Sequence, residues 1–179
     1  MAEIEIHHGH AHGGDEQVDP LAKRVGLAVG VIGVLLAVVT IAGHREHTIA
    51  VIERTKSNDQ WAYYQAKKVR EHTSEVGREL VTALATDQGR AAAATEKLAA
   101  MAARYKGEAE EVQKRAQEFD QSTERSEHKA VRFDLGEGFL ELGLVLTSLY
   151  FLGRQRLFTL VGGLSAAVGL VVALSALSL

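Results

Sequence analysis

Cysteine is absent from the 179 residues, and proline occurs once. Without cysteine the chain has no disulfides, thiolate metal sites or cysteine nucleophiles. With one proline it has long stretches that contain no strong helix breaker. Its 20 Lys and Arg against 23 Asp and Glu give a net charge of -3. This charge argues against a basic nucleic-acid-binding surface, so we expect no nucleic-acid partner.

Recognisable reaction motifs are lacking as well. The sequence has no phosphate-binding GxxxxGK, no dinucleotide-binding glycine fingerprint, no HExxH and no GxSxG nucleophile elbow. We therefore do not expect an enzyme.

The mean hydropathy of -0.02 conceals separate apolar and charged blocks. Residues 25–43 and 157–179 carry no charge, and residues 138–152 carry only Glu141. A helix that crosses a bilayer needs about 20 apolar residues, and the third run reaches that length if it starts near Phe133. The sequence predicts an all-α membrane protein with three transmembrane helices, at 20–43, 133–152 and 157–179.

The first apolar run could instead be a signal peptide. A signal peptide has a short basic region before its apolar core, whereas the segment before this run is 24 residues long and acidic. This favours a retained membrane anchor. Asp19 and Pro20 suit the cap and first position of a helix. Lys23, Arg24, Arg154 and Arg156 would share one side of the membrane. The excess of Lys and Arg in short cytoplasmic segments then places the N-terminus in the cytoplasm and the long central segment outside.

That central segment, residues 44–132, is rich in Ala, Glu, Lys and Gln, and Asp87-Gln88-Gly89 is its only strong breaker. We expect a long antiparallel coiled-coil hairpin with its turn near 87–89. Apolar and small residues recur at alternating steps of four and three, as in a coiled-coil seam. The predicted seam consists of Ala62, Ala66, Val69, Thr73, Val76, Leu80 and Ala83 in the first arm. In the second arm it consists of Leu98, Ala102, Tyr105, Ala109, Val112, Ala116, Phe119, Thr123, Ser126, Ala130 and Phe133, in one helix that continues into the membrane.

Residues 57–68, SNDQWAYYQAKK, resemble the signature of an uncharacterised family of small bacterial membrane proteins, classed as a domain of unknown function. The likeness extends over nearly the whole chain, from the His- and Glu-rich residues 1–19 to the two closing membrane helices. It implies a multi-pass protein of the bacterial cytoplasmic (inner) membrane and supplies no activity. Ser57 with Gln60 could also form a capping box that starts a new helix.

Aromatic residues make up only 6% of the chain, and Trp61, Tyr63 and Tyr64 form their densest group. They either pack against the returning arm near 122–129 or anchor an interface with another copy or another protein.

Three acidic residues, Asp134, Glu137 and Glu141, lie on one stripe of the predicted second membrane helix. His44, Arg45 and His47 should lie at the same membrane face. The group could be a neutralised structural cluster or, in an oligomer, a cation or proton pathway. It could also bind metal or sense protons through the two histidines.

Small residues recur at packing intervals in the membrane helices. Gly26 and Gly30 form a GxxxG motif, and Gly162, Ala166, Gly169, Ala173 and Ala176 form a stripe. Such residues allow close helix approach, either within one chain or between copies.

Four histidines, His7, His8, His10 and His12, lie in the N-terminal tail. They are either part of a solvated tail or a weak site for a divalent metal such as Zn, Ni or Cu. We expect no other cofactor.

Together these features favour a non-enzymatic membrane protein. We expect it to self-assemble, or to act as a structural or accessory subunit of a larger membrane complex, through its helical hairpin. The alternative is a homo-oligomeric cation or proton pathway that uses Asp134, Glu137 and Glu141.

Overall fold

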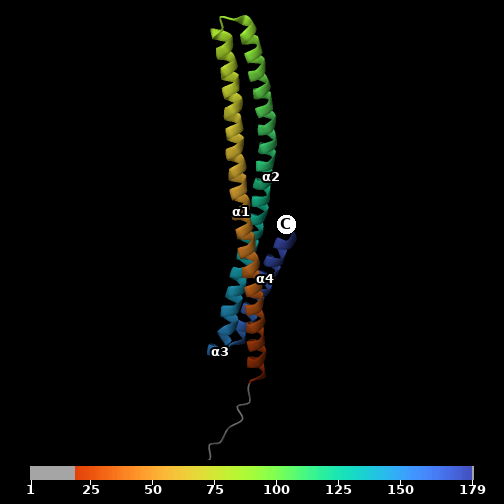
Figure 1. Ribbon diagram of the computed structural model, residues 1–179. Coiled ribbons are helices and arrows are strands. Elements are labelled where there is room, and N and C mark those ends of the chain that lie inside the picture. The colour runs from red at the N-terminus through yellow and green to blue at the C-terminus, as the bar shows by residue number, and fades with distance from the viewer. Residues whose placement is uncertain (1–18, 179) are drawn as a thin grey trace, which may run out of the picture.

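The computed structural model describes residues 19–178 and consists of long helices (Figure 1). α1 spans Pro20–Leu84 and α2 spans Gln88–Ser148. A short helix, α3 (Tyr150–Gly153), leads into α4 (Arg156–Ser175), which ends in a 3-10 turn, η1 (Ala176–Ser178). Three helical stretches are long and apolar enough to cross a membrane: α1, α2 continued by α3, and α4 continued by η1.

α1 begins as the sequence predicts. Pro20 takes the first helical position, and the Asp19 carboxylate accepts a hydrogen bond from the Leu21 amide at 2.9 Å. The helix then continues for 65 residues without a break. The prediction that a new helix starts at Ser57 is therefore wrong. No glycine or proline lies between Gly43 and Ser57, so nothing in this segment ends the first helix.

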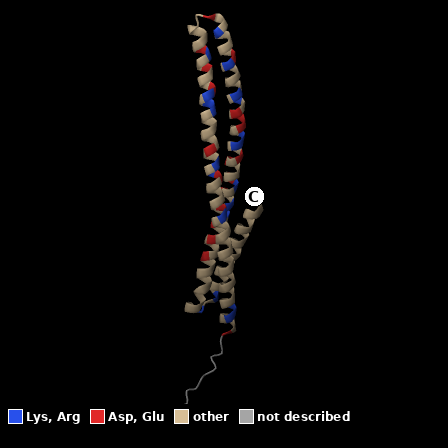
Figure 2. Ribbon diagram, in the orientation of Figure 1, with Lys and Arg blue, Asp and Glu red and all other residues tan. Residues whose placement is uncertain are grey.

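The two long helices run antiparallel and form a hairpin (Figure 1). The break expected at 87–89 falls at residues 85–87, and Asp87 caps α2 by accepting hydrogen bonds from the amides of Gly89 and Arg90. We call residues 44–132 the hairpin. Charged residues are concentrated there, as Figure 2 shows.

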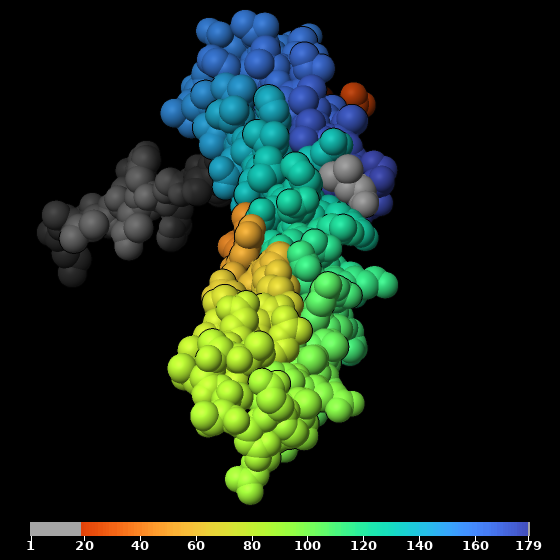
Figure 3. Space-filling model, turned by 90° about the horizontal axis from the view of Figure 1, so that it is seen from above, coloured from red at the N-terminus to blue at the C-terminus, as the bar shows by residue number. Residues whose placement is uncertain are grey.

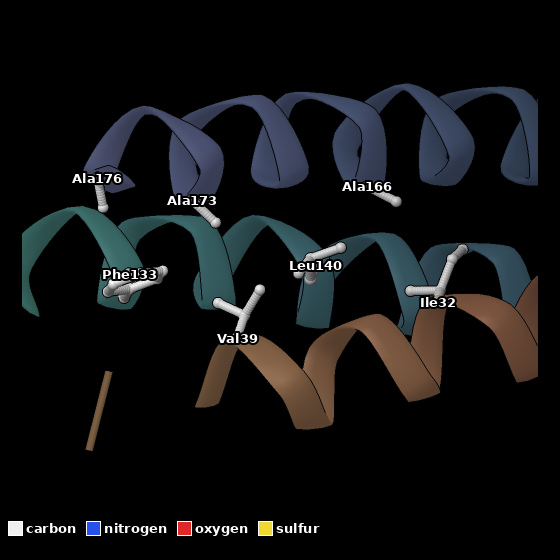
Figure 4. Close-up of a cluster of buried hydrophobic side chains, with 7 residues drawn as sticks. All are labelled: Ile32, Val39, Phe133, Leu140, Ala166, Ala173 and Ala176. Atoms are coloured by element: carbon white, nitrogen blue, oxygen red, sulfur yellow. The ribbon is translucent and has the colours of Figure 1, made fainter. Parts of the chain in front are cut away.

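The remaining described residues, 19–43 and 133–178, form the apolar bundle. α2 lies between α1 and α4 (Figure 4). Buried Ile32 and Val39 of α1 pack with Phe133 and Leu140 of α2. The face that α4 and η1 contribute is made of small residues, namely Ala166, Ala173 and Ala176. The close approach of α4 to α2 follows from these small side chains.

Candidate functional site

Residues 57–68 of α1 connect the two arms of the hairpin through polar side chains. Ser57 and Trp61 lie one turn apart on α1, so their side chains point to the same side. The Ser57 hydroxyl donates to Oδ1 of Asp120 at 2.6 Å, and the Trp61 indole donates to Oδ2 at 2.9 Å. Both hydrogen bonds lower the pKa of Asp120 below its ordinary value of 3.8, and the bond from Ser57 has the larger effect. One carboxylate of α2 thus satisfies two donors of α1.

The aromatic group divides between the interior and the surface. Tyr64 is half-buried and meets Trp61 edge-on, with ring centroids 5.6 Å apart. Tyr63 is 50% exposed, and its ring lies 4.9 Å from the Lys67 ammonium nitrogen. The polar partner of Trp61 is Asp120, just before the range 122–129 that the sequence suggested. Trp61 and Tyr64 therefore serve contacts within the chain, while Tyr63 presents half its surface to the outside.

Six residues beyond Trp61 on α1, a lysine is buried between the arms. Lys67 pairs with the Glu108 carboxylate, which also accepts a hydrogen bond from Arg104 Nε at 2.7 Å. The hydrogen bonds from Lys67 and Arg104 lower the pKa of Glu108 below its ordinary value of 4.5, and the bond from Lys67 has the larger effect. Glu108 in turn raises the pKa of Lys67. A buried charge needs such partners, since an unpaired one carries a large desolvation cost. Nothing in the heptad pattern of the sequence indicated Asp120 or Glu108.

The side of α1 that faces α2 is consequently polar. Its buried residues in the hairpin beyond Ala50 are Ser57, Lys67, Glu71 and Ser74. The seam predicted for this arm is wrong, because all seven of its residues are exposed. We call these seven residues the outer stripe: Ala62, Ala66, Val69, Thr73, Val76, Leu80 and Ala83. The arms of α1 (yellow) and α2 (green) lie side by side in Figure 3.

The second arm behaves differently. Its predicted seam residues from Ala109 to Phe133 are buried or half-buried against α1. After one additional step of three, from Phe133 to Gly136, the alternation resumes through buried Gly136, Leu140, Gly143, Thr147 and Tyr150. One face of α2 therefore contacts a neighbouring helix along most of its length.

The acidic stripe meets α1 at two of its three positions. Asp134 lies 2.9 Å from His47 Nε2, and Glu137 accepts a hydrogen bond from the Thr40 hydroxyl at 2.8 Å. His44 instead lies beside the Thr40 carbonyl oxygen, at 3.1 Å, and Arg45 is exposed. The structure therefore brings His47 to the acids but directs His44 to its own helix.

Glu141 stands apart from this arrangement. Its side chain is exposed on the apolar bundle, beside Leu142 and Val145, which are 57% and 56% exposed. Within residues 19–178 it makes no side-chain hydrogen bond or ion pair. An exposed carboxylate surrounded by exposed apolar side chains is the clearest chemical irregularity of the apolar bundle.

Metal ligands do not gather in the described part of the chain. No group of three or more His, Asp or Glu residues close enough to hold an ion occurs among residues 19–178. The candidate ligands His7, His8, His10 and His12 lie outside the described residues.

The α4 stripe packs against glycines of α2. A Cβ added at Gly143 would lie 2.8 Å from the Gly162 carbonyl oxygen and 2.9 Å from the Ala166 Cβ. One at Gly136 would lie 2.8 Å from the Gly169 carbonyl oxygen. The sequence interpretation missed Gly136 and Gly143, whose separation of seven residues equals that of Gly162 and Gly169. In this chain Gly162, Ala166 and Gly169 are thus occupied by an internal contact.

Gly26 and Gly30 are exposed, and an added Cβ at Gly30 would meet nothing within 4 Å. They line a shallow apolar groove on the outside of α1, together with Leu27, Val31, Val34 and Leu35. At Gly26 an added Cβ would only touch the ring of Phe151 in α3, at 3.9 Å, so no described helix packs closely on this GxxxG motif.

These observations define an all-helical protein with a long polar hairpin attached to an apolar bundle. A family model described as a domain of unknown function (DUF4337) matches residues 21–179, and the chain belongs to this family. No curated protein and no solved structure matches the chain.

Proposed function

We propose that this protein is a non-enzymatic integral membrane protein whose hairpin acts as an assembly element. In this proposal the apolar bundle crosses the bacterial cytoplasmic membrane three times, with the N-terminus in the cytoplasm and the hairpin outside. Lys23, Arg24, Arg154 and Arg156 support this orientation, because cytoplasmic segments are enriched in Lys and Arg. The helices α1 and α2 pass from the bundle into the hairpin without a break, so the hairpin is a stiff extension of the membrane part.

The observation that carries the proposal is the inverted polarity of α1 in the hairpin. Lys67 and Glu71 are buried against α2, whereas Val69 and Leu80 are 65% and 54% exposed. In an isolated hairpin outside the bilayer, this arrangement leaves apolar surface in water and charges in the interior, both of which are unfavourable. A partner that covers the outer stripe would remove its apolar surface from water. The hairpin is therefore suited to contact another helix.

Mass measurement tests the assembly role. The full chain is inserted into lipid nanodiscs, and its native mass is determined at protein concentrations that span its cellular level. We expect a species heavier than one chain, either alone or after extraction with lipid from its own membrane. A mass of one chain under both conditions would contradict the proposal.

A cation or proton pathway is the second candidate, and the exposed position of Glu141 favours it. A carboxylate in the lipid-facing part of a membrane helix is costly, and such residues usually face a partner or a water-filled cavity. In an oligomer, Glu141 of several copies could line one path. Two features weaken this candidate. Asp134 and Glu137 already have partners on α1, and Thr147 and Tyr150 beyond Glu141 are buried within the chain.

A further inference from the structure

We propose that the outer stripe pairs with the same stripe of a second copy of this chain, in parallel and in register. This inference rests on the assembly role proposed above and identifies its surface and its partner. The stripe comprises seven consecutive positions, from Ala62 to Ala83, with alternating steps of four and three residues and no charge. All seven side chains are exposed. This spacing keeps one seam facing a single straight partner helix, the geometry of a left-handed coiled coil.

Membrane anchoring makes a second copy the matching occupant. α1 enters the hairpin from the apolar bundle as one continuous helix, so copies inserted with the same topology present parallel arms. Each residue then lies at the same height above the bilayer as its counterpart. Val69 meets Val69, Val76 meets Val76 and Leu80 meets Leu80, which gives a self-complementary apolar core about a two-fold axis.

The residues that flank the stripe are compatible with this pairing. In a parallel coiled coil, a residue just before one seam position faces the residue five places later in the partner. Gln65 would therefore face Arg70 of the second copy, and Glu79 would face Leu84 of the second copy. His72 would face Gly77 of the second copy, so no like charges meet within the paired segment.

Charge also sets where the pairing starts. Asp59 occupies the next position of the same register before Ala62, and its side chain is exposed. In a parallel pair it would face its own counterpart, so close contact begins beyond it. The paired segment therefore lies in the outer half of the hairpin.

Segments of the same chain cannot easily take this place. α4 packs on the part of α2 that lies in the apolar bundle, away from the outer stripe, as Figures 1 and 4 show. Residues 1–18 precede the opposite end of α1, and Ala62 is 42 residues from Pro20, or about 63 Å at 1.5 Å per residue. Lipid covers the apolar bundle but not a stripe that begins beyond the charged positions Arg45 and Asp59.

Single-cysteine cross-linking tests the inference directly, because the natural chain has no cysteine. Full-length Val69→Cys, Val76→Cys and Thr82→Cys variants are inserted in nanodiscs and treated with a short thiol cross-linker. Thr82 is the matched control, since it is exposed but lies on another side of the helix. We expect the dimer as the main product at positions 69 and 76 and only background dimer at position 82.

A charge variant provides the second arm of the test. Val76→Glu introduced into the Val69→Cys chain should abolish the cross-link, whereas Glu75→Gln should leave it unchanged. Val76 is 39% exposed, so the helix content of the double variant is compared with that of Val69→Cys by far-UV circular dichroism, and the two spectra should agree if the hairpin itself is intact. Heavy assemblies with no cross-link at 69 or 76 would overturn this inference while leaving the assembly role intact. A single-chain mass would overturn both, and cross-linking of position 69 only to another protein would replace the second copy with that partner.

Discussion

The indole nitrogen of Trp61 donates a hydrogen bond to Oδ2 of Asp120 at 2.9 Å, across 59 residues of chain. The other oxygen of the same carboxylate accepts from Ser57, whose side chain is fully buried. Ser57 and Trp61 therefore form a polar connection between the arms. This connection places α1 in a fixed rotation against α2, with the outer stripe directed away from the hairpin interior.

Replacing Asp120 should loosen the hairpin. In Asp120→Ala, the hydroxyl of Ser57 and the indole N–H of Trp61 lose their acceptor, and an unsatisfied buried donor costs about 1–3 kcal/mol. We expect a lower unfolding temperature in nanodiscs, followed by far-UV circular dichroism. Glu118→Ala is the control, because Glu118 is exposed and has no side-chain partner within residues 19–178. Equal melting of the two variants would show that the connection does not hold the arms.

Acid should weaken the same connection. The pKa of Asp120 and the pKa of Glu108 are both lowered in the folded chain, by Ser57 and Trp61 and by Lys67 and Arg104 respectively. A carboxyl with a lowered pKa stabilises the fold fully above its unfolded pKa, and this contribution disappears as the pH falls through the folded value. We expect the unfolding temperature to change little between pH 7 and 5 and to fall below about pH 4.

The variant Asp120→Asn separates this contribution from that of the other acids. It should be less stable than the natural chain at pH 7 and should approach it as the pH falls below about 4. Glu118→Gln should follow the natural chain at every pH. A difference in unfolding temperature between Asp120→Asn and the natural chain that stays constant from pH 7 to pH 3 would contradict the lowered pKa of Asp120.

Sequence periodicity predicted the contact face of α2 but not that of α1. Val69, Val76 and Leu80 have the spacing of a seam, and periodicity cannot tell which helix covers it. Lys67 and Glu71 are charged and lie between the predicted seam positions. Lys67 is buried with Glu108 of α2 as its partner, and Glu71 is buried with Lys68 of its own helix as its partner. The Lys67–Glu108 pair depends on how the two arms align, which the sequence alone leaves open.

The apolar bundle was predicted more completely. The three apolar runs, the Asp19 cap and the continuous path of α2 through Phe133 all follow from composition and the rarity of proline. The contact between Gly136 and Gly143 of α2 and the α4 stripe was missed, because a glycine in a membrane helix carries little information until its neighbour is known. The exposure of Glu141 likewise required the three-dimensional arrangement.

Substitution of Gly143 tests that contact. Gly143→Val would place its Cβ within 3 Å of Gly162 and Ala166 and force α4 away from α2. Such overpacking costs about 1–3 kcal/mol, or more where backbone must move. We expect faster proteolysis and a lower unfolding temperature in nanodiscs. Gly163→Val is the control, since a Cβ there meets nothing within 4 Å. A stable Gly143→Val chain would contradict the observed packing.

Flux measurements decide the second candidate function. If Glu141 carries cations or protons, Glu141→Gln should abolish the cation or proton flux across the membrane of liposomes that contain the protein. The reason is that the amide does not ionise at neutral pH. Leu142→Gln serves as a control for a polar group on the neighbouring exposed position. Flux that is absent from the natural chain, or equal in Glu141→Gln, would exclude the pathway and leave the assembly role.

The central claim is that two copies pair through the outer stripe in parallel register. Its most direct measurement is the distance between spin labels on Val76→Cys in two copies, by pulsed electron paramagnetic resonance in nanodiscs. Parallel pairing predicts a single short distance, consistent with helix axes about 8–10 Å apart, and a longer distance for labels on Thr82→Cys. No intermolecular coupling at Val76, or a distance no shorter than that at Thr82, would contradict the account.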